Sequence, residues 1–303
     1  MKAIEIKDID GNVLFAYKCE NNSVKKTLEK AIRQNVELRC ANLMEANLNN
    51  ANLRNADLRN ANLNGADLRN ANLYLANIGW ANLNGSDLSG ANLRNANLNS
   101  ANLYGAKLCA ADLNGADLSG ADLCNAILND ANLNEAHLIN AKVCGANLCD
   151  SYLDYANLRY ADLNGADLRY ANLRWSNLNG ANLRNANLFN ANLVNANLND
   201  TKLDNANLRN ANLFNANLRN ANLDSVDLRN ANLYLANLKS SNLNYANFSN
   251  ANLNGANLCH TNSCYANLDD AYLCDANSCY ANFRNTNLSC TDLCNAILRG
   301  AKK

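Results

Sequence analysis

The feature that most constrains this chain is a five-residue repeat that runs from Val36 to Gly300 without an insertion or a deletion. With Leu43 as position i, one unit reads ANLME and the next reads ANLNN. Residues 36–300 are 265 residues, which at five residues a unit make 53 units. An internal repeat outranks local propensity as a guide to architecture, so the fold must itself repeat every five residues.

Neither regular secondary structure can use such a period. An α-helix turns about 100° per residue, so leucines five apart would step around the whole helix surface. A straight strand alternates its faces, so every second leucine would point into water. A chain that bends after each short strand returns every leucine to one interior. The repeat therefore predicts an all-β solenoid.

The units ANLRN at 51–55 and ADLRN at 56–60 resemble the repeats of the pentapeptide repeat family, whose consensus is A-(N/D)-L-x-x. This resemblance implies a right-handed quadrilateral β-helix with four units per coil and with positions i and i−2 pointing inward. The residues alone lead to a solenoid and do not choose four sides over three. At twenty residues per coil, 265 residues make about thirteen coils, a rod on the order of 60 Å long.

The interior can be read from positions i and i−2. Position i is leucine in 47 of the 53 units, and position i−2 is alanine in 43. The six exceptions at position i are Ile78, Val143, Phe248, Ser263, Ser278 and Phe283. Ser263 and Phe283 are twenty residues apart, so the ring is expected to fill space beside the small side chain. We expect the buried serines to bond to nearby carbonyl groups.

Residues 1–35 do not follow the repeat. Apolar residues alternate on both sides of Asp10-Gly11, which predicts a β-hairpin with a two-residue turn. Asn22 or Ser23 can then cap a helix with the apolar stripe Val24, Leu28, Ala31 and Ile32, and with an i,i+4 pair between Glu29 and Arg33. We therefore expect a hairpin-and-helix cap at 1–35, lying over the first coil of a solenoid at 36–303.

The repeat also runs to within three residues of the other end, where only Ala301, Lys302 and Lys303 follow. Such a coil has open leucines and unpaired backbone groups. We expect it to pair with a second copy of the chain, as a homodimer, or to fray.

The first eight residues, MKAIEIKD, are too charged for a secretory leader, and no apolar run reaches the length of a membrane span. These features favour a cytoplasmic protein that does not bind membranes. Eleven of the twelve cysteines fall at outward positions i+1 and i+2, where we expect reduced thiols. Three pairs are twenty residues apart and could still be oxidised, namely Cys124 with Cys144, Cys259 with Cys279, and Cys274 with Cys294.

Catalysis finds no support in this sequence. Its two histidines, His137 and His260, have no nucleophile and carboxylate arranged around them. His260 with Cys264 and Cys290 invites a zinc site, but no C-x-x-C spacing occurs and the residues fall on different faces. We therefore expect no enzyme activity, no cofactor and no metal.

Function is then expected on the outer faces, where residues twenty apart form columns. Two neighbouring columns carry apolar and aromatic residues mixed with charges, a combination that binding hot spots use. The alternative is that stacked rings only stabilise neighbouring coils. The candidate partner-binding edge comprises Tyr152, Asp154, Tyr155, Arg174, Trp175, Val194, Phe214, Tyr234 and Leu235.

The family resemblance also implies one alternative function, the imitation of double-stranded DNA by members that bind DNA gyrase, a topoisomerase. Imitating a polyanion requires a strongly negative surface. Of the 27 basic and 27 acidic residues, 7 and 5 lie in residues 1–35, which leaves 20 basic and 22 acidic residues in the coils. This near balance also makes direct nucleic-acid binding unexpected. The favoured function is a rigid structural or protein-interaction rod with an unidentified protein partner.

Overall fold

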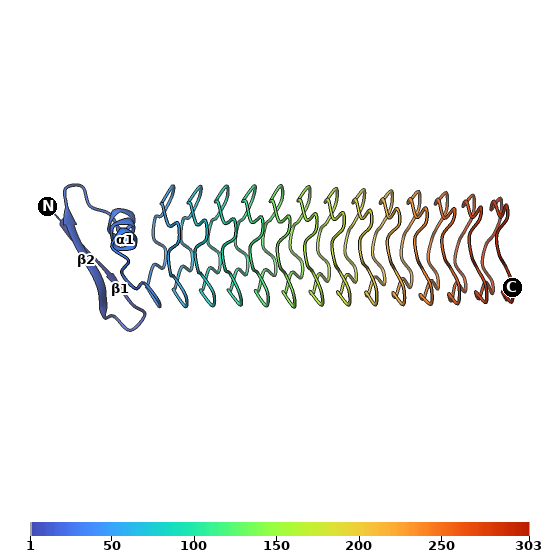
Figure 1. Cartoon of the computed structure of the whole chain (residues 1–303), viewed down its shortest axis with the longest axis horizontal. Coiled ribbons are helices and arrows are strands. Elements are labelled where there is room, and N and C mark those ends of the chain that lie inside the picture. The colour runs from blue at the N-terminus through green and yellow to red at the C-terminus, as the bar shows by residue number, and fades with distance from the viewer. Residues whose placement is uncertain (1, 303) are drawn as a thin grey trace. The chain divides into compact units, whose positions relative to one another are not determined.

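The computed structural model describes residues 2–302 and divides the chain into two compact units, residues 1–147 and residues 148–303. The first contains the only regular strands and helix of the described residues, labelled in Figure 1, and it continues into coils. The second consists of coils throughout. No helix in residues 2–302 combines the length and the apolar character that crossing a membrane requires.

The N-terminal residues form an antiparallel hairpin of β1 (Lys2–Lys7) and β2 (Val13–Cys19). The predicted two-residue turn is wrong. The backbone N–H of Asp8 donates to the carbonyl of Asn12 at 2.9 Å, which leaves three residues between them. The carboxylate of Asp8 also accepts from the N–H groups of Asp10 and Asn12, at 3.0 and 2.8 Å. This side chain supplies the bonds that a tighter turn would have made between backbone groups.

Helix α1 (Val24–Arg33) follows, with Ser23 as its N-cap. The Ser23 hydroxyl accepts from the N–H of Lys26 at 3.1 Å, which satisfies one of the free amides of the first turn. Thr27, Leu28 and Ala31 are buried. Glu29 forms the predicted ion pair with Arg33, at 3.7 Å, and also accepts from the N–H of Asn52 in the coils at 2.9 Å.

The hairpin and the helix both bond to the first coil residues. The N–H of Ile9 donates to the carbonyl of Cys40 at 3.0 Å, and the N–H of Asn42 donates to the carbonyl of Lys7 at 2.8 Å. Lys25 Nζ reaches the carbonyl of Asn49 at 2.9 Å. These bonds occupy backbone groups at the start of the repeat. The division at residue 35 into a cap and a solenoid stays a prediction.

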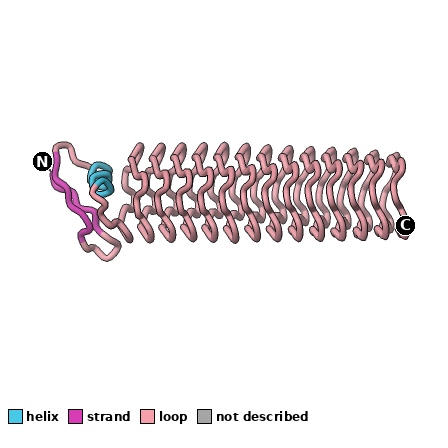
Figure 2. Tube along the Cα trace, viewed as in Figure 1, coloured by secondary structure: helices cyan, strands magenta, loops and turns pink. Residues whose placement is uncertain are grey.

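Beyond residue 41, the chain pairs with itself at a separation of twenty residues. Isolated parallel bridges join Asn42 to Asn62, Asn47 to Asp67, and so on within each of the two compact units. Each bridge involves one residue per strand, so Figure 2 draws the coils as loop. Twenty residues are four units of five, which makes each coil a quadrilateral. This separation supplies the choice of four sides that the residues alone left open.

Each corner turns through a left-handed residue at position i+2. Asn55, Asn60 and Gly65 there have φ of 58°, 58° and 63°, a region open to glycine and tolerated by asparagine. The side chain at i−1 supports many of these turns, as where Asn62 Oδ1 accepts from the N–H of Asn64 at 3.2 Å. No β-branched residue occupies a multiple of five between 40 and 300. Corner geometry therefore explains the frequent asparagine and glycine of the repeat.

Burial confirms that positions i and i−2 face inward. From Leu38 to Phe283, the residues at both positions are at most 5% exposed wherever position i carries an apolar side chain, except for the half-buried Ala46. Five hydroxyl residues at position i−2 donate to the leucine carbonyl three residues earlier, at 2.6–2.7 Å, namely Ser86, Ser151, Ser176, Thr201 and Ser241. They satisfy their polar groups inside the coil without a partner from another element.

The two serines at position i differ from this expectation. Ser263 Oγ donates to Thr261 Oγ1 at 3.4 Å, a hydroxyl instead of a carbonyl. Ser278 is fully buried and its Oγ has no hydrogen-bond partner, so the expected carbonyl bond is wrong at this position. Position i points to the centre of the coil, among the interior apolar side chains, and the carbonyl of Ser278 itself accepts from the N–H of Ala281 at 3.1 Å. Phe283 is buried nearby in sequence, at 5% exposure.

Candidate interaction surface

The residues predicted as a binding edge all lie in the second unit and fall on one corner of successive coils. We call the set Tyr152, Asp154, Tyr155, Arg174, Trp175, Val194, Phe214, Tyr234 and Leu235 the aromatic edge. The aromatic edge spans five successive coils, and we call its part on each coil a rung. Backbone N–H groups donate to carbonyls of the next rung at 2.9–3.0 Å, namely Tyr155 to Arg174, Trp175 to Val194, Asn195 to Phe214, and Asn215 to Tyr234. The structure therefore brings these residues together in the predicted register.

At the first two rungs, two aromatic rings stack. The rings of Tyr155 and Trp175 are parallel within 1°, with centroids 6.3 Å apart. Tyr155 is 61% exposed and Trp175 is 54% exposed, so their outer faces are open to solvent. Tyr152 on the same coil is also exposed. Large rings that are both rigid and exposed suit a protein-binding surface.

An ion pair lies beside these rings. Arg174 contacts Asp154 through its backbone N–H at 3.1 Å and through a guanidinium nitrogen at 2.6 Å. The Asp154 side chain is only 13% exposed, and these bonds hold the pKa of the Arg174 guanidinium above its ordinary value. Asn172 Nδ2 donates to the same carboxylate at 3.1 Å, while its Oδ1 is buried without a partner. The N–H of Arg174 therefore donates to the carboxylate of Asp154 on the preceding coil, where most turns use the side chain two residues earlier, here Asn172.

The last rungs form a second apolar group. The rings of Phe214 and Tyr234 have centroids 5.8 Å apart with planes tilted by 35°. Leu235 lies against Gly255 of the next coil, where an added Cβ would fall 2.8 Å from the leucine Cδ2. Val194, between the two groups, is half-buried. The edge is therefore two exposed groups joined by a less exposed rung.

Three residues of the aromatic edge occupy corner positions that disfavour them. Tyr155, Trp175 and Leu235 have φ of 60°, 59° and 60°. A bulky side chain in this left-handed region costs about 1–2 kcal/mol relative to an ordinary backbone conformation, and asparagine or glycine avoids much of that cost. Strained residues of this kind gather at functional sites.

The sequence analysis missed further aromatic stacks in the second unit. The rings of Tyr245 and Tyr265 lie 5.1 Å apart and within 4° of parallel, and those of His260 and Tyr280 lie 5.2 Å apart and within 8°. Both pairs occupy position i+2 and are separated by twenty residues. That numbering was a usable signal, because rings twenty residues apart occupy equivalent positions on neighbouring coils. They lie on other corners than the aromatic edge.

The cysteines correct the expectation of reduced thiols. Cys124 and Cys144 form a disulfide between successive coils, with Cα atoms 4.6 Å apart. Cys259 and Cys279 form another, with Cα atoms 4.7 Å apart. The coil spacing alone places stacked cysteines within disulfide range. Cys274 and Cys294, the third stacked pair, are free.

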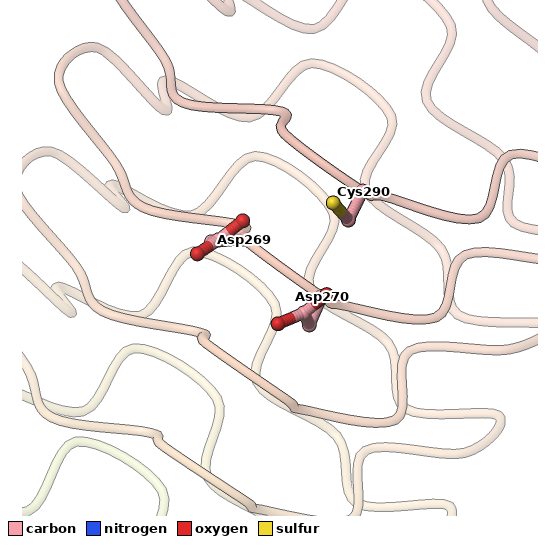
Figure 3. A group of neighbouring side chains, drawn as sticks. All are labelled: Asp269, Asp270 and Cys290. Carbon is pink, nitrogen blue, oxygen red and sulfur yellow. The ribbon is translucent and has the colours of Figure 1, made fainter.

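One group of side chains in residues 2–302 has ligand atoms close enough to hold a metal ion. One ligand atom from each of Asp269, Asp270 and Cys290 lies within 4.8 Å of the others, and two of the three residues are exposed. Figure 3 shows these side chains on neighbouring coils. His260 is not among them. The set mixes hard carboxylate and soft thiolate ligands, which prefer different metals. Its position on two neighbouring coils follows from the repeat, so it gives no reason to assign a metal.

The interior is least covered in the last coils. Leu288 and Leu293 are only half-buried, and Leu298 is 36% exposed. A hollow of about 200 Å³ opens there. It is lined by Leu273, Phe283, Leu288, Leu293, Leu298 and Ala301. This apolar surface is the open coil end on which the homodimer prediction rests.

Comparison with known proteins assigns the chain to a family. The family of pentapeptide repeats matches in eight copies between residues 37 and 302, with small gaps and overlaps. Curated proteins yield no match. HetL, a pentapeptide repeat protein involved in heterocyst differentiation regulation in the cyanobacterium Nostoc sp. strain PCC 7120, is 34% identical and similar over 78% of this chain and 95% of its own, with a TM-score of 0.28.

Two further solved structures are similar. QnrB1, a plasmid-mediated fluoroquinolone resistance protein, is 18% identical over 71% of this chain and 88% of its own, with a TM-score of 0.44. Rfr23 from the cyanobacterium Cyanothece 51142 is 31% identical over 44% of this chain and 63% of its own, with a TM-score of 0.19. The family match covers nearly all of the coils. The chain therefore belongs to the pentapeptide repeat family, and its fold is the right-handed quadrilateral β-helix of that family.

Proposed function

We propose that the protein is a non-enzymatic interaction scaffold and that the aromatic edge binds a protein partner. The observation that carries this proposal is that Tyr155 and Trp175, stacked and more than half exposed, share one corner of successive coils with the Asp154–Arg174 ion pair. Both rings hold a left-handed backbone that asparagine or glycine occupies at most corners. Other corners, such as those at Trp80 and Tyr160, carry such rings too, so the grouping of rings and charges on one corner favours a role outside the fold.

The aromatic edge is also chemically suited to a partner. Its rings offer apolar area, and Arg174 offers a guanidinium already oriented by Asp154. A pre-oriented side chain loses little conformational freedom on binding. The fitting partner presents an apolar strip with a carboxylate or carbonyl acceptor beside it.

The test replaces Trp175 by asparagine, which the corner accepts. Trp175→Asn should keep or raise the thermal midpoint and should remove the partner recovered by affinity purification from the native host. Trp80→Asn is the matched control, since Trp80 has φ of 57° and is 57% exposed in the first unit, outside the aromatic edge. Equal recovery of every partner by Trp175→Asn and the unaltered chain would refute the binding role.

Imitation of DNA for topoisomerase binding is the alternative, and the ion pairs weigh against it. Several carboxylates that could stand for phosphates are neutralised by an arginine two residues on, as in Asp167–Arg169 and Asp227–Arg229, at 2.7 and 2.6 Å. A phosphate mimic needs free negative charge. A supercoiling assay with purified gyrase tests this, and inhibition at a stoichiometric ratio would favour mimicry over the scaffold proposal.

We also propose that the leucine hollow of the last coils is covered by a second copy of the chain. Leucine side chains at half exposure are unfavourable in water, at about 25 cal/mol for each Å² of apolar surface left open. Light scattering should then report a dimer, and Leu298→Asp should give a monomer. A monomer of the unaltered chain at all concentrations would overturn this proposal.

The cytoplasmic location stays a prediction, and the two disulfides weigh against it. Glutathione keeps most cytosolic thiols reduced, whereas disulfides persist in oxidising compartments. Thiol trapping in intact host cells tests the point, because alkylated Cys124 and Cys259 would indicate a reducing compartment.

A further inference from the structure

The third stacked cysteine pair has the same register as the two disulfides. The N–H of Leu273 donates to the carbonyl of Asp292 at 2.7 Å, and the N–H of Asp275 donates to the carbonyl of Cys294 at 2.8 Å. These two bonds flank Cys274 and fix Cys294 opposite it on the next coil. The bonded pairs have Cα atoms 4.6 and 4.7 Å apart in the same arrangement. Cys274 and Cys294 are therefore aligned to bond without any change in the backbone.

A carboxylate distinguishes this pair from the other two. Cys274 Sγ donates to Asp292 Oδ2 at 3.1 Å, and the N–H of Cys294 donates to Asp292 Oδ1 at 3.1 Å. The bond to Asp292, followed by desolvation, raises the pKa of the Cys274 thiol to about 11. Asp292 therefore stabilises the protonated thiol of Cys274. Cys294 is exposed to solvent, so a small reagent can reach it.

We propose that Cys274 and Cys294 form a reversible dithiol site whose reactant is a small-molecule disulfide of the glutathione type. Exchange converts the open pair into a third disulfide between coils. This inference is independent of the proposed role of the aromatic edge. In the other two stacked pairs the residue two before the second cysteine is Asn277 or Lys142, so neither has a carboxylate at the place of Asp292. Asp122 lies beside the first cysteine of its pair and accepts from the N–H of Cys124 at 3.0 Å.

The exchange balances in two steps. The thiolate of Cys294 attacks one sulfur of glutathione disulfide, and the S–S bond of the reagent breaks to release one glutathione. Cys274 then loses its proton to solvent, and its sulfur attacks Cys294 Sγ to release the second glutathione. Two protein thiols are oxidised to one disulfide while one glutathione disulfide is reduced to two thiols. Excess reduced glutathione reverses the sequence.

The new disulfide would link the last three coils covalently. The disulfide between Cys259 and Cys279 joins residues 243–262 to residues 263–282. A bond between Cys274 and Cys294 would join residues 263–282 to residues 283–302, where the interior leucines are least buried. Closing a loop of this length restricts local opening by roughly a hundredfold. The dithiol would thus set how readily the last coils open.

The test equilibrates the full chain with mixtures of glutathione and glutathione disulfide, alkylates the remaining thiols and maps tryptic peptides by mass. Cleavage after Lys239, Arg284 and Arg299 places Cys274 on peptide 240–284 and Cys294 on peptide 285–299. The expected product is a cross-link between these peptides that appears with glutathione disulfide and disappears with excess glutathione. Amide hydrogen exchange of residues 285–299 should slow by roughly a hundredfold in the cross-linked form.

Two serine variants locate the bond. Cys290 is exposed, lies on the same tryptic peptide and has Asp270 instead of a cysteine twenty residues before it. Cys290→Ser should keep the cross-link, and Cys294→Ser should abolish it. A cross-link that survives Cys294→Ser, or a stable glutathione adduct on Cys294 with no cross-link, would overturn the proposal. A pair that stays bonded in excess glutathione would also overturn it, as a third permanent disulfide.

Discussion

The ring of Tyr160 lies flat over Gly180 in the next coil, so close that a Cβ on the glycine would fall 2.5 Å from Cδ1 of the ring. Both residues occupy corner positions with positive φ, at 57° and 69°. The same relationship recurs between Tyr280 and Gly300, at 2.6 Å. An aromatic ring at a corner therefore needs a glycine twenty residues later when the ring folds along the coil axis, whereas it stacks on a second ring when one is present.

The first prediction is that Gly180→Ala destabilises the second unit by more than corner strain alone. Alanine in the left-handed region costs about 1 kcal/mol, and the displaced Tyr160 ring adds about 1–3 kcal/mol of overpacking. Gly165→Ala is the control, because Gly165 has φ of 66° with nothing within 4 Å of its added Cβ. The measurement is the thermal midpoint by circular dichroism. Equal losses for the two variants would show that the Tyr160 ring does not constrain Gly180.

The second prediction concerns the buried hydroxyl of Ser278. Because its Oγ has no partner, the group loses its hydration without compensation, at about 1–3 kcal/mol. Ser278→Ala should therefore raise the free energy of unfolding by about 1 kcal/mol. Ser241→Ala is the contrast, since that hydroxyl donates to the Leu238 carbonyl at 2.6 Å, and its removal should not stabilise. A loss of stability in Ser278→Ala would mean that the hydroxyl has a partner in solution.

The five-residue spacing of the repeat predicts most of the fold, and a few residues show local structure that this spacing does not predict. Leucine and alanine at every fifth position predicted the interior because only a bending chain can bury them together. The turn at Asp10-Gly11 was predicted wrongly, since the Asp8 carboxylate draws the chain into a wider loop. Ser278 was predicted to find a carbonyl, but its side chain stands at position i among the interior apolar side chains, and its own carbonyl accepts from the N–H of Ala281. Side-chain competition of this kind cannot be read from a period.

The candidate edge could be predicted from residues spaced twenty apart, but the backbone strain and the ion pair within it could not. Numbering placed Trp175 above Tyr155 and Phe214 above Val194. It did not show that Tyr155 and Trp175 hold a left-handed backbone, since that depends on where the corner falls within the unit. The pairing of Asp154 with Arg174 in place of the usual asparagine turn was equally hidden. The spacing of twenty residues identified the cysteine pairs, but their outward positions and the expected cytoplasmic location led us to expect reduced thiols.

The third prediction is a loss of stability in acid through the corner carboxylates. The Arg69 guanidinium hydrogen-bonds Asp67 and lowers the pKa of that carboxyl from 3.8 to about 2, and Arg59 does the same for Asp57. A folded pKa below the unfolded value gives stability that is present above about pH 4 and is lost as the pH falls from about 4 to 2. Both ion pairs lie at the surface, with the Asp57 and Asp67 side chains 34% and 26% exposed, so solvent screening keeps each effect small.

The measurement is the thermal midpoint between pH 5 and pH 2. The Asp67→Asn and Arg69→Ser variants should both show a smaller fall than the unaltered chain, because each removes the pair that titrates. Serine is the residue that stands at the equivalent position 89 of the next coil. A fall as steep as in the unaltered chain would assign the acid sensitivity to other carboxylates.

The fourth prediction concerns the disulfide between Cys124 and Cys144, which ties two coils of the first unit. A loop of twenty residues closed by a disulfide stabilises by about 3 kcal/mol in the chain-entropy account. Cys124→Ser should therefore speed amide hydrogen exchange in residues 124–144 by roughly a hundredfold. Local exchange is the right measurement, because a repeat array need not unfold in one step. Cys109→Ser, which removes a free thiol of the same unit, should leave this exchange unchanged.

Treatment with a reductant distinguishes the effect of the disulfide from the effect of replacing a cysteine side chain. Dithiothreitol should accelerate exchange of residues 124–144 in the unaltered chain to the rate of Cys124→Ser, and it should have no further effect on that variant. If Cys124→Ser and the unaltered chain exchanged equally without reductant, the coil hydrogen bonds alone would determine local opening. The disulfide would then add a covalent bond between coils that backbone hydrogen bonds already hold together. We would expect the same of the disulfide between Cys259 and Cys279.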